Sequence, residues 1–142
     1  MKMIVEQTFH YPKRMIWRPE ERRFVESDRN SLMYDRGFSY PYSWIRESGT
    51  PPGPHCDCML MSRRDCELGD EIDIKIIGVF LRADGDHKYV VVERQRAEED
   101  LAELAEEERQ ALQRLYPRIG DGEGWLGREK ALDCYEHGER AL

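Results

Sequence analysis

The sequence has no long hydrophobic run: no stretch approaches the roughly 18 consecutive apolar residues that a membrane-spanning helix needs. Its first residues, Met1 to Glu6, turn acidic at once and contain no apolar signal-peptide core. An excess of positive charge is also missing, because 29 Asp and Glu outnumber 22 Lys and Arg and give a net charge of −7 at pH 7. We therefore expect a cytoplasmic protein that binds neither nucleic acid nor an anionic membrane.

Cysteine is scarce, and its spacing is unusual for a metal site. Three of the four cysteines lie close together, in His55-Cys56-x-Cys58 and at Cys66. Thiolates and imidazole are the ligands that zinc prefers. However, only one residue separates Cys56 from Cys58, and there is no second CxxC pair. Buried free thiols are the favoured interpretation for a reduced cytosolic chain, and a zinc-stabilised domain is the alternative.

What the chain does contain is enough apolar and aromatic material for one hydrophobic core. Its 142 residues include three Trp, seven Tyr and four Phe, with 39% hydrophobic and 36% charged residues. This length suits one domain, and the aromatic side chains supply burial that offsets chain entropy. We predict that residues 1–142 form a single domain with a compact core and a heavily charged surface.

Alternation of apolar and polar residues predicts strands through the first two-thirds of the chain. The predicted strands are Met3–Phe9, a hairpin of Met15–Trp17 with Phe24–Val25, Ser39–Ile45, Cys56–Met61, Ile72–Leu81 and His87–Glu93. The turn signal Asp84-Gly85-Asp86 joins the last two. In the fourth strand, alternation places Cys56, Cys58 and Leu60 on one face and Asp57, Met59 and Met61 on the other.

After Arg96 the pattern becomes helical. A stripe of Leu101, Leu104, Ala105, Ala111, Leu112 and Leu115 predicts a helix of about five turns, which Pro117 ends. Gly120–Gly124 is expected to be a loop, and a second helix starts at about Gly127 with Ala131, Cys134, Tyr135, Gly138 and Leu142 on one side. Strands followed by helices predict a mainly β, α+β fold, an OB-like closed barrel of five strands with two C-terminal helices.

Four segments, in order along the chain, carry a further pattern. They are Tyr40–Ile45, Pro52–Leu60, Gly69–Glu93 and Asp100–Tyr116. The second reads Pro-Gly-Pro-His-Cys-Asp-Cys-Met-Leu, and it stands where a known motif reads Asp-Gly-Asp-Pro-x-Asp-Val-(Leu/Met). Together these segments resemble the motifs of the soluble inorganic pyrophosphatase family, and the resemblance covers nearly the whole chain.

The resemblance implies Mg²⁺-dependent hydrolysis of pyrophosphate, or of a related phosphoanhydride, to phosphate. Divalent ions neutralise such a substrate and lower the pKa of an attacking water, and carboxylates suit them as ligands. Matched residue by residue, the resemblance implies Asp57, Asp84, Asp86 and Glu6 as Mg²⁺ ligands, Asp57 also as the catalytic residue, and Lys88, Tyr42 and Tyr116 as phosphate-binding residues. By analogy with bacterial members of the family, a homo-oligomer is expected.

The chain departs from the family motif at two acidic positions. Pro52 and Pro54 stand where the family has aspartates, one of them a metal ligand and the other the expected general base. Proline has no carboxylate, and the loss of one such group commonly lowers the rate by about 10²–10⁴. Two hypotheses follow: a weakly active pyrophosphatase, or a catalytically degenerate binding or assembly module.

The phosphate-binding cations of the family are also incompletely matched. Pro117 replaces a second phosphate-binding lysine. Arg14 can stand for a lysine near the N-terminus, and either Arg29 or Arg36 can stand for the family's arginine. Spacing does not choose between the two arginines.

Several of these residues have simpler structural explanations. Asp84 and Asp86 suit an ordinary hairpin turn, because Asp-Gly is a common turn dipeptide. Asp57 lies in an otherwise apolar strand, where a lone carboxylate needs a partner, a metal or water. Tyr116 fits a core residue at a helix end as well as it fits a phosphate ligand.

Overall fold

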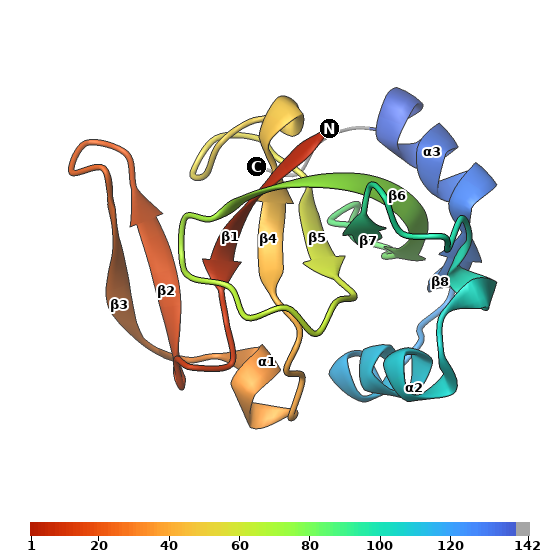
Figure 1. Cartoon of the computed structure of the whole chain (residues 1–142), viewed down its shortest axis with the longest axis horizontal. Helices are drawn as coiled ribbons and strands as arrows, with labels where there is room; N and C mark the ends of the chain where they lie inside the picture. Colours follow the sequence, from red (N-terminus) through yellow and green to blue (C-terminus); the bar gives the residue numbers. More distant parts are fainter. Residues whose placement is uncertain (139–142) are drawn as a thin grey trace.

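The chain folds around a closed five-stranded barrel. The computed structural model describes residues 1–138. The order around the barrel is β1 (Lys2–Gln7), β4 (Tyr42–Ile45), β5 (Asp57–Leu60), β7 (Lys88–Glu93) and β6 (Glu71–Leu81), and β6 pairs back with β1 (Figure 1). Of these pairs only β5–β7 is parallel. The predicted α+β fold with an OB-like barrel is confirmed.

A two-stranded hairpin projects beside the barrel. It consists of β2 (Lys13–Arg18) and β3 (Arg23–Asn30) and lies next to β1 (Figure 1). The predicted hairpin is therefore confirmed, with longer strands than expected. A short helix, α1 (Leu32–Asp35), follows, and the Ser31 hydroxyl caps it by accepting a hydrogen bond from the Tyr34 N–H. A 3₁₀ turn, η1 (Arg46–Ser48), follows β4.

The prediction of one five-turn helix after Arg96 was wrong. The chain forms a 3₁₀ turn, η2 (Leu101–Glu103), is extended at Leu104 and Ala105, and begins again as α2 (Glu106–Leu115). The Glu108 side chain accepts a hydrogen bond from the Ala105 N–H and so starts the new helix. Because apolar residues continue across the break, the sequence pattern did not reveal it.

The C-terminal part adds a strand that the sequence did not predict. Strand β8 (Gly124–Gly127) pairs with β6 outside the barrel, and α3 (Arg128–His137) follows it directly. Two of its four residues are glycine, so no alternating pattern marked it. Of the predicted face of α3, Leu142 lies outside the described residues. No helix within residues 1–138 is long and apolar enough to cross a membrane.

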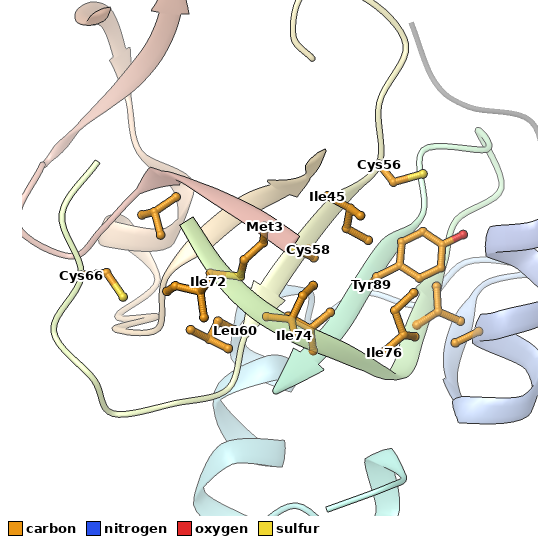
Figure 2. Packing of buried hydrophobic residues seen from close by; sticks show 14 residues of the cluster. Met3, Ile45, Cys56, Cys58, Leu60, Cys66, Ile72, Ile74, Ile76 and Tyr89 are labelled. Carbon is orange, nitrogen blue, oxygen red and sulfur yellow. The ribbon is translucent and has the colours of Figure 1, made fainter. Parts of the chain in front are cut away.

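The buried hydrophobic residues form two clusters, one inside the barrel and one on its outer face. The inner cluster draws Met3, Ile45, Cys58, Ile74 and Val91, among others, from all five barrel strands (Figure 2). The outer cluster packs Met59, Met61, Val90 and Ile77 against Ala111, Leu112 and Leu115 of α2. The predicted alternation of Cys56–Met61 is confirmed, and it places Asp57 on the outer face.

Candidate functional site

Asp57 is held between two cations. Asp57 begins β5, and Lys88 begins the neighbouring parallel strand β7, directly opposite it in the strand register. The Lys88 Nζ donates to Asp57 Oδ2 at 2.8 Å, and His55 Nε2 lies 3.1 Å from Asp57 Oδ1. The side chains of Lys88 and Asp57 are only 6% and 12% exposed. A buried carboxylate at a strand start therefore has a cation beside each of its oxygens.

The pKa values of these three groups follow from the pairing. Burial alone would raise the pKa of Asp57, but His55 and Lys88 lower it more strongly. The interaction with Asp57 raises the pKa of His55 to about 9 against the effect of burial. Burial likewise opposes protonation of Lys88, yet the Asp57 charge raises the pKa of its ammonium. At pH 7 the trio consists of one carboxylate, one imidazolium and one ammonium.

Glu6 lies next to this trio in a different charge state. It is buried near the end of β1. Burial, followed by the negative charge of Asp57, raises the pKa of Glu6 to about 8, although Arg14, His55 and Lys88 act in the opposite direction. Glu6 is therefore mostly protonated at pH 7.

The two aspartates of the acidic loop between β6 and β7 contact different cations. Asp86 Oδ2 lies 3.0 Å from Lys88 Nζ, so Lys88 bridges Asp86 and Asp57. Asp84 Oδ1 accepts a hydrogen bond from the Asp86 N–H at 2.9 Å and Asp84 Oδ2 lies 3.3 Å from Arg82. The hydrogen bond from the Asp86 N–H to Asp84 Oδ1 is a typical turn interaction. Of the two aspartates, Asp86 contacts the Asp57–Lys88 pair directly.

The two predicted tyrosines border the same cluster. The ring centroid of the buried Tyr42 lies 5.8 Å from Lys88 Nζ. Burial raises the pKa of Tyr42, and the Asp57 charge adds to the effect. Tyr116 stacks on Phe80 at 4.9 Å between ring centroids, and Arg82 lies 5.9 Å over its ring. Tyr116 is thus a packed residue at the end of α2, close enough to Lys88 and Asp57 for their charges to affect its pKa, which burial raises.

His55 is the residue whose role the sequence reasoning missed. The sequence pattern indicates His55 only as a candidate zinc ligand beside Cys56 and Cys58. In the resembling motif a proline stands at this position. The signal that could have identified it is the spacing: His55 lies two residues before Asp57, so an extended chain places both side chains on one face.

The donor set around Asp57 does not fit a Mg²⁺ centre. Asp57 Oδ1 is a buried oxygen that accepts no well-formed hydrogen bond within the described residues, and this is the one feature that suits a cation. Against it, Pro52 and Pro54 supply no carboxylate. Within residues 1–138 no three His, Cys, Asp or Glu side chains are grouped as metal ligands are. The predicted Mg²⁺ ligands therefore stay a prediction that this geometry does not favour.

The cysteines are largely shielded from solvent. Cys56, Cys58 and Cys66 are buried and Cys134 is partly buried, which agrees with the burial that the favoured interpretation predicts. Burial raises the pKa of Cys58 well above its usual value, so its thiol is protonated at neutral pH. Cys58 therefore packs in the barrel as a small apolar residue.

Comparison with solved structures identifies the class of fold. The chain has the fold of the inorganic pyrophosphatases. It superposes on the inorganic pyrophosphatase from Neisseria gonorrhoeae with a TM-score of 0.75 and 18% identity, covering 97% of this chain and 88% of that one. The pyrophosphatases from Ehrlichia chaffeensis (TM-score 0.71, 20% identity, 92% and 87% covered) and Thermus thermophilus (0.69, 16%, 94% and 85%) are also similar. No protein-family model and no curated protein matches the chain.

Proposed function

We propose that this pyrophosphatase-fold protein binds a small phosphate-containing anion, with pyrophosphate as the first to test, and does not depend on Mg²⁺ to do so. One observation carries the proposal: the buried Asp57 carboxylate is clamped by Lys88 and His55 at 2.8 and 3.1 Å. In a metal-dependent site such a carboxylate holds cations from solution. Here two side chains supply that positive charge.

The charge balance of the site supports an anionic ligand. Lys88, His55 and Arg14 are positive, and Asp57 and Asp86 are negative, while Glu6 is protonated below its pKa of about 8. The cations of this cluster therefore at least balance its carboxylates, although the chain as a whole is acidic. A local positive field in an acidic protein attracts a small anion.

Two groups are placed to receive the anion. Arg14 is exposed on β2 and makes no ion pair within the described residues, although it is close enough to Glu6 to affect its pKa. Lys88 has three N–H donors, of which two contact Asp57 and Asp86. The Asp86 side chain is 37% exposed, so an entering phosphate can compete with it for Lys88.

Calorimetric titration of pyrophosphate in EDTA, and again in Mg²⁺, tests the proposal. We expect binding in both solutions and a loss of about tenfold in Arg14→Gln, a change that corresponds to one charge-assisted contact. Arg18→Gln is the matched control, because Arg18 is exposed on the same strand and pairs only with Glu21, at 3.8 Å, within residues 1–138. Absence of binding in EDTA would refute the proposal.

Weak Mg²⁺-dependent hydrolysis is the second candidate function. It is favoured by Asp57 Oδ1, the buried oxygen with no well-formed hydrogen bond in the described chain, together with Lys88, Tyr42 and Asp86 in one cluster. Phosphate release from pyrophosphate with and without Mg²⁺, beside an Asp57→Asn variant, separates the two. Release that needs Mg²⁺ and disappears in the variant would favour the enzyme. No release above the variant, with binding retained, favours the metal-independent binding module.

A further inference from the structure

An aromatic pocket lies between the β2–β3 hairpin and the outer face of the barrel. Its volume is about 330 Å³, and its lining consists of Ile4, Trp17, Phe24, Trp44, Arg46, Thr50 and Gly69. Pockets for small molecules commonly begin at about 300 Å³. None of the residues assigned to the anion site lines it.

Three aromatic rings form the walls of this pocket. Trp17 and Phe24 face each other across the hairpin with ring centroids 5.0 Å apart. Trp44 of β4 lies 6.3 Å from Trp17 and 6.2 Å from Phe24. Trp17 and Phe24 are only partly buried. Aromatic faces gathered around an open cavity suit a flat π-system, because stacking on such faces is favourable for any heteroaromatic ring.

The indole of Trp44 forms the most buried wall of the pocket. Only 3% of the residue is exposed, and its Nε1 is a buried atom without a hydrogen-bond partner within residues 1–138. Because this atom has almost no accessible surface, a ligand in the pocket would contact the ring of Trp44 and not its N–H. Trp44 therefore contributes an apolar aromatic surface to the pocket.

The aromatic pocket adjoins the anion site. Trp44 and Asp57 are direct register partners on the antiparallel strands β4 and β5, so their side chains lie on the same face of the sheet. Arg46 at the pocket is already engaged by two carboxylates, Glu47 at 3.5 Å and Glu71. A phosphate joined to a ring in this pocket would therefore be bound on the Lys88 side.

We propose that Trp17, Phe24 and Trp44 hold a planar aromatic ring. We further assign the ligand as a phosphate ester of such a ring, of the chemical class of a nucleoside diphosphate, and this second part rests on the proposed function. Stacking would come from the hairpin and β4, and the negative charge would be bound beside Lys88 and His55. The β2–β3 hairpin thus forms one side of the proposed ligand site.

Three probes test the ring site and the anion site separately. They are adenosine, adenosine diphosphate and pyrophosphate, each titrated in EDTA by calorimetry and by tryptophan fluorescence. We expect the diphosphate nucleoside to bind about tenfold or more tightly than either fragment. Trp17→Ala should remove that advantage, as loss of one stacking ring does, and leave pyrophosphate affinity unchanged. Ile16→Ala is the control, because Ile16 is exposed on the same strand and does not line the pocket. Phe24→Leu tests the second wall while keeping an apolar side chain.

Each result decides one part. If adenosine does not bind, or if Trp17→Ala and Phe24→Leu leave the nucleotide affinity unchanged while both remain folded by circular dichroism, the ring site is refuted. If adenosine binds and pyrophosphate does not, the ring site stands, and the proposed anion function fails together with the nucleotide assignment. If all three bind but the nucleotide is no tighter than its fragments, the two sites do not share a ligand.

Discussion

Lys88 and Asp57 stand directly opposite each other on the parallel strands β7 and β5, and their side chains form a buried ion pair of 2.8 Å between Nζ and Oδ2. The pair joins positions 31 residues apart in the sequence. It also contributes to the charge of the site, because the ammonium lies beside one of the two carboxylate oxygens of Asp57.

Replacing Lys88 with methionine should destabilise the fold strongly. Removal of Lys88 leaves Asp57 buried without one of its two counter-ions, and breaking a buried pair in this way commonly costs about 3–5 kcal/mol. The measurement is the free energy of unfolding in urea. The double variant Lys88→Met with Asp57→Asn should recover part of the loss, since it removes the uncompensated charge as well.

Lys2→Met is the matched control for this prediction. Lys2 also pairs with an aspartate, Asp73 at 3.5 Å, but both side chains are 40% or more exposed. Exposed pairs typically contribute about 0–1 kcal/mol. Equal losses in Lys88→Met and Lys2→Met would show that burial of the Lys88 pair has no energetic effect.

The barrel was predictable from the sequence because its information is local. Period-two alternation in Cys56–Met61 sorts each side chain to the inner or outer face wherever the chain is extended, and the inner and outer clusters follow that sorting. The break at Leu104 and Ala105 was not predictable in this way. The apolar spacing continues through it, and only the Glu108–Ala105 hydrogen bond marks the new helix start.

The sequence resemblance grouped several residues that lie together in the structure, but it did not predict how they pair. The motif resemblance selected Asp57, Lys88, Asp86 and Tyr42, and the structure brings these four together. That Lys88 would pair with Asp57 depends on the register of two strands far apart in sequence, which no local pattern specifies. The role of His55 was missed for a related reason, because the motif has no side chain of that charge at its position.

The stability of the protein should fall as the pH rises from about 5 to 9. The pKa of Glu6 is raised from 4.5 to about 8 by burial and by Asp57, and that of His55 from 6.5 to about 9 by Asp57. Both groups therefore hold protons in the folded state that the unfolded state releases, and their contribution is lost as the pH rises through the folded pKa values. Asp57 acts oppositely at acid pH, because its pKa is lowered.

Urea unfolding at intervals between pH 5 and pH 9.5 measures this dependence. Glu6→Gln should flatten the lower part of the profile, up to about pH 8, and His55→Gln should flatten the part between pH 6.5 and 9. The charge of Lys88 also acts on Glu6, but the pKa of Lys88 is itself raised, so Lys88 stays positive over this range and does not produce the slope. A wild-type profile that rises between pH 6 and 9 would contradict the charge states assigned to both residues.

Leu112→Ala should lower stability by about 2–5 kcal/mol, because it opens a cavity in the outer cluster beneath α2. The neighbouring Gln113→Ala is the control, since Gln113 is exposed on the same helix and its replacement should change stability by less than about 0.5 kcal/mol. Urea denaturation of both variants checks this. A loss in Leu112→Ala no larger than that of the control would mean that α2 is not packed on the barrel.

Restoring the acidic motif should create a stronger response to Mg²⁺ than that of the natural chain. The triple variant Pro52→Asp, Pro54→Asp, His55→Pro adds two carboxylates near Asp57 and removes one of the two cations that now clamp it. Hard divalent ions bind such oxygen clusters. A ligand at 100 times its dissociation constant stabilises the folded state by about 2.7 kcal/mol, so thermal unfolding of the variant should shift upward by several degrees in Mg²⁺.

The control Pro52→Asn, Pro54→Asn, His55→Pro has the same backbone changes without the added carboxylates and should shift much less. A wild-type chain stabilised by Mg²⁺ as much as the triple variant would mean that Lys88 and His55 do not exclude the metal.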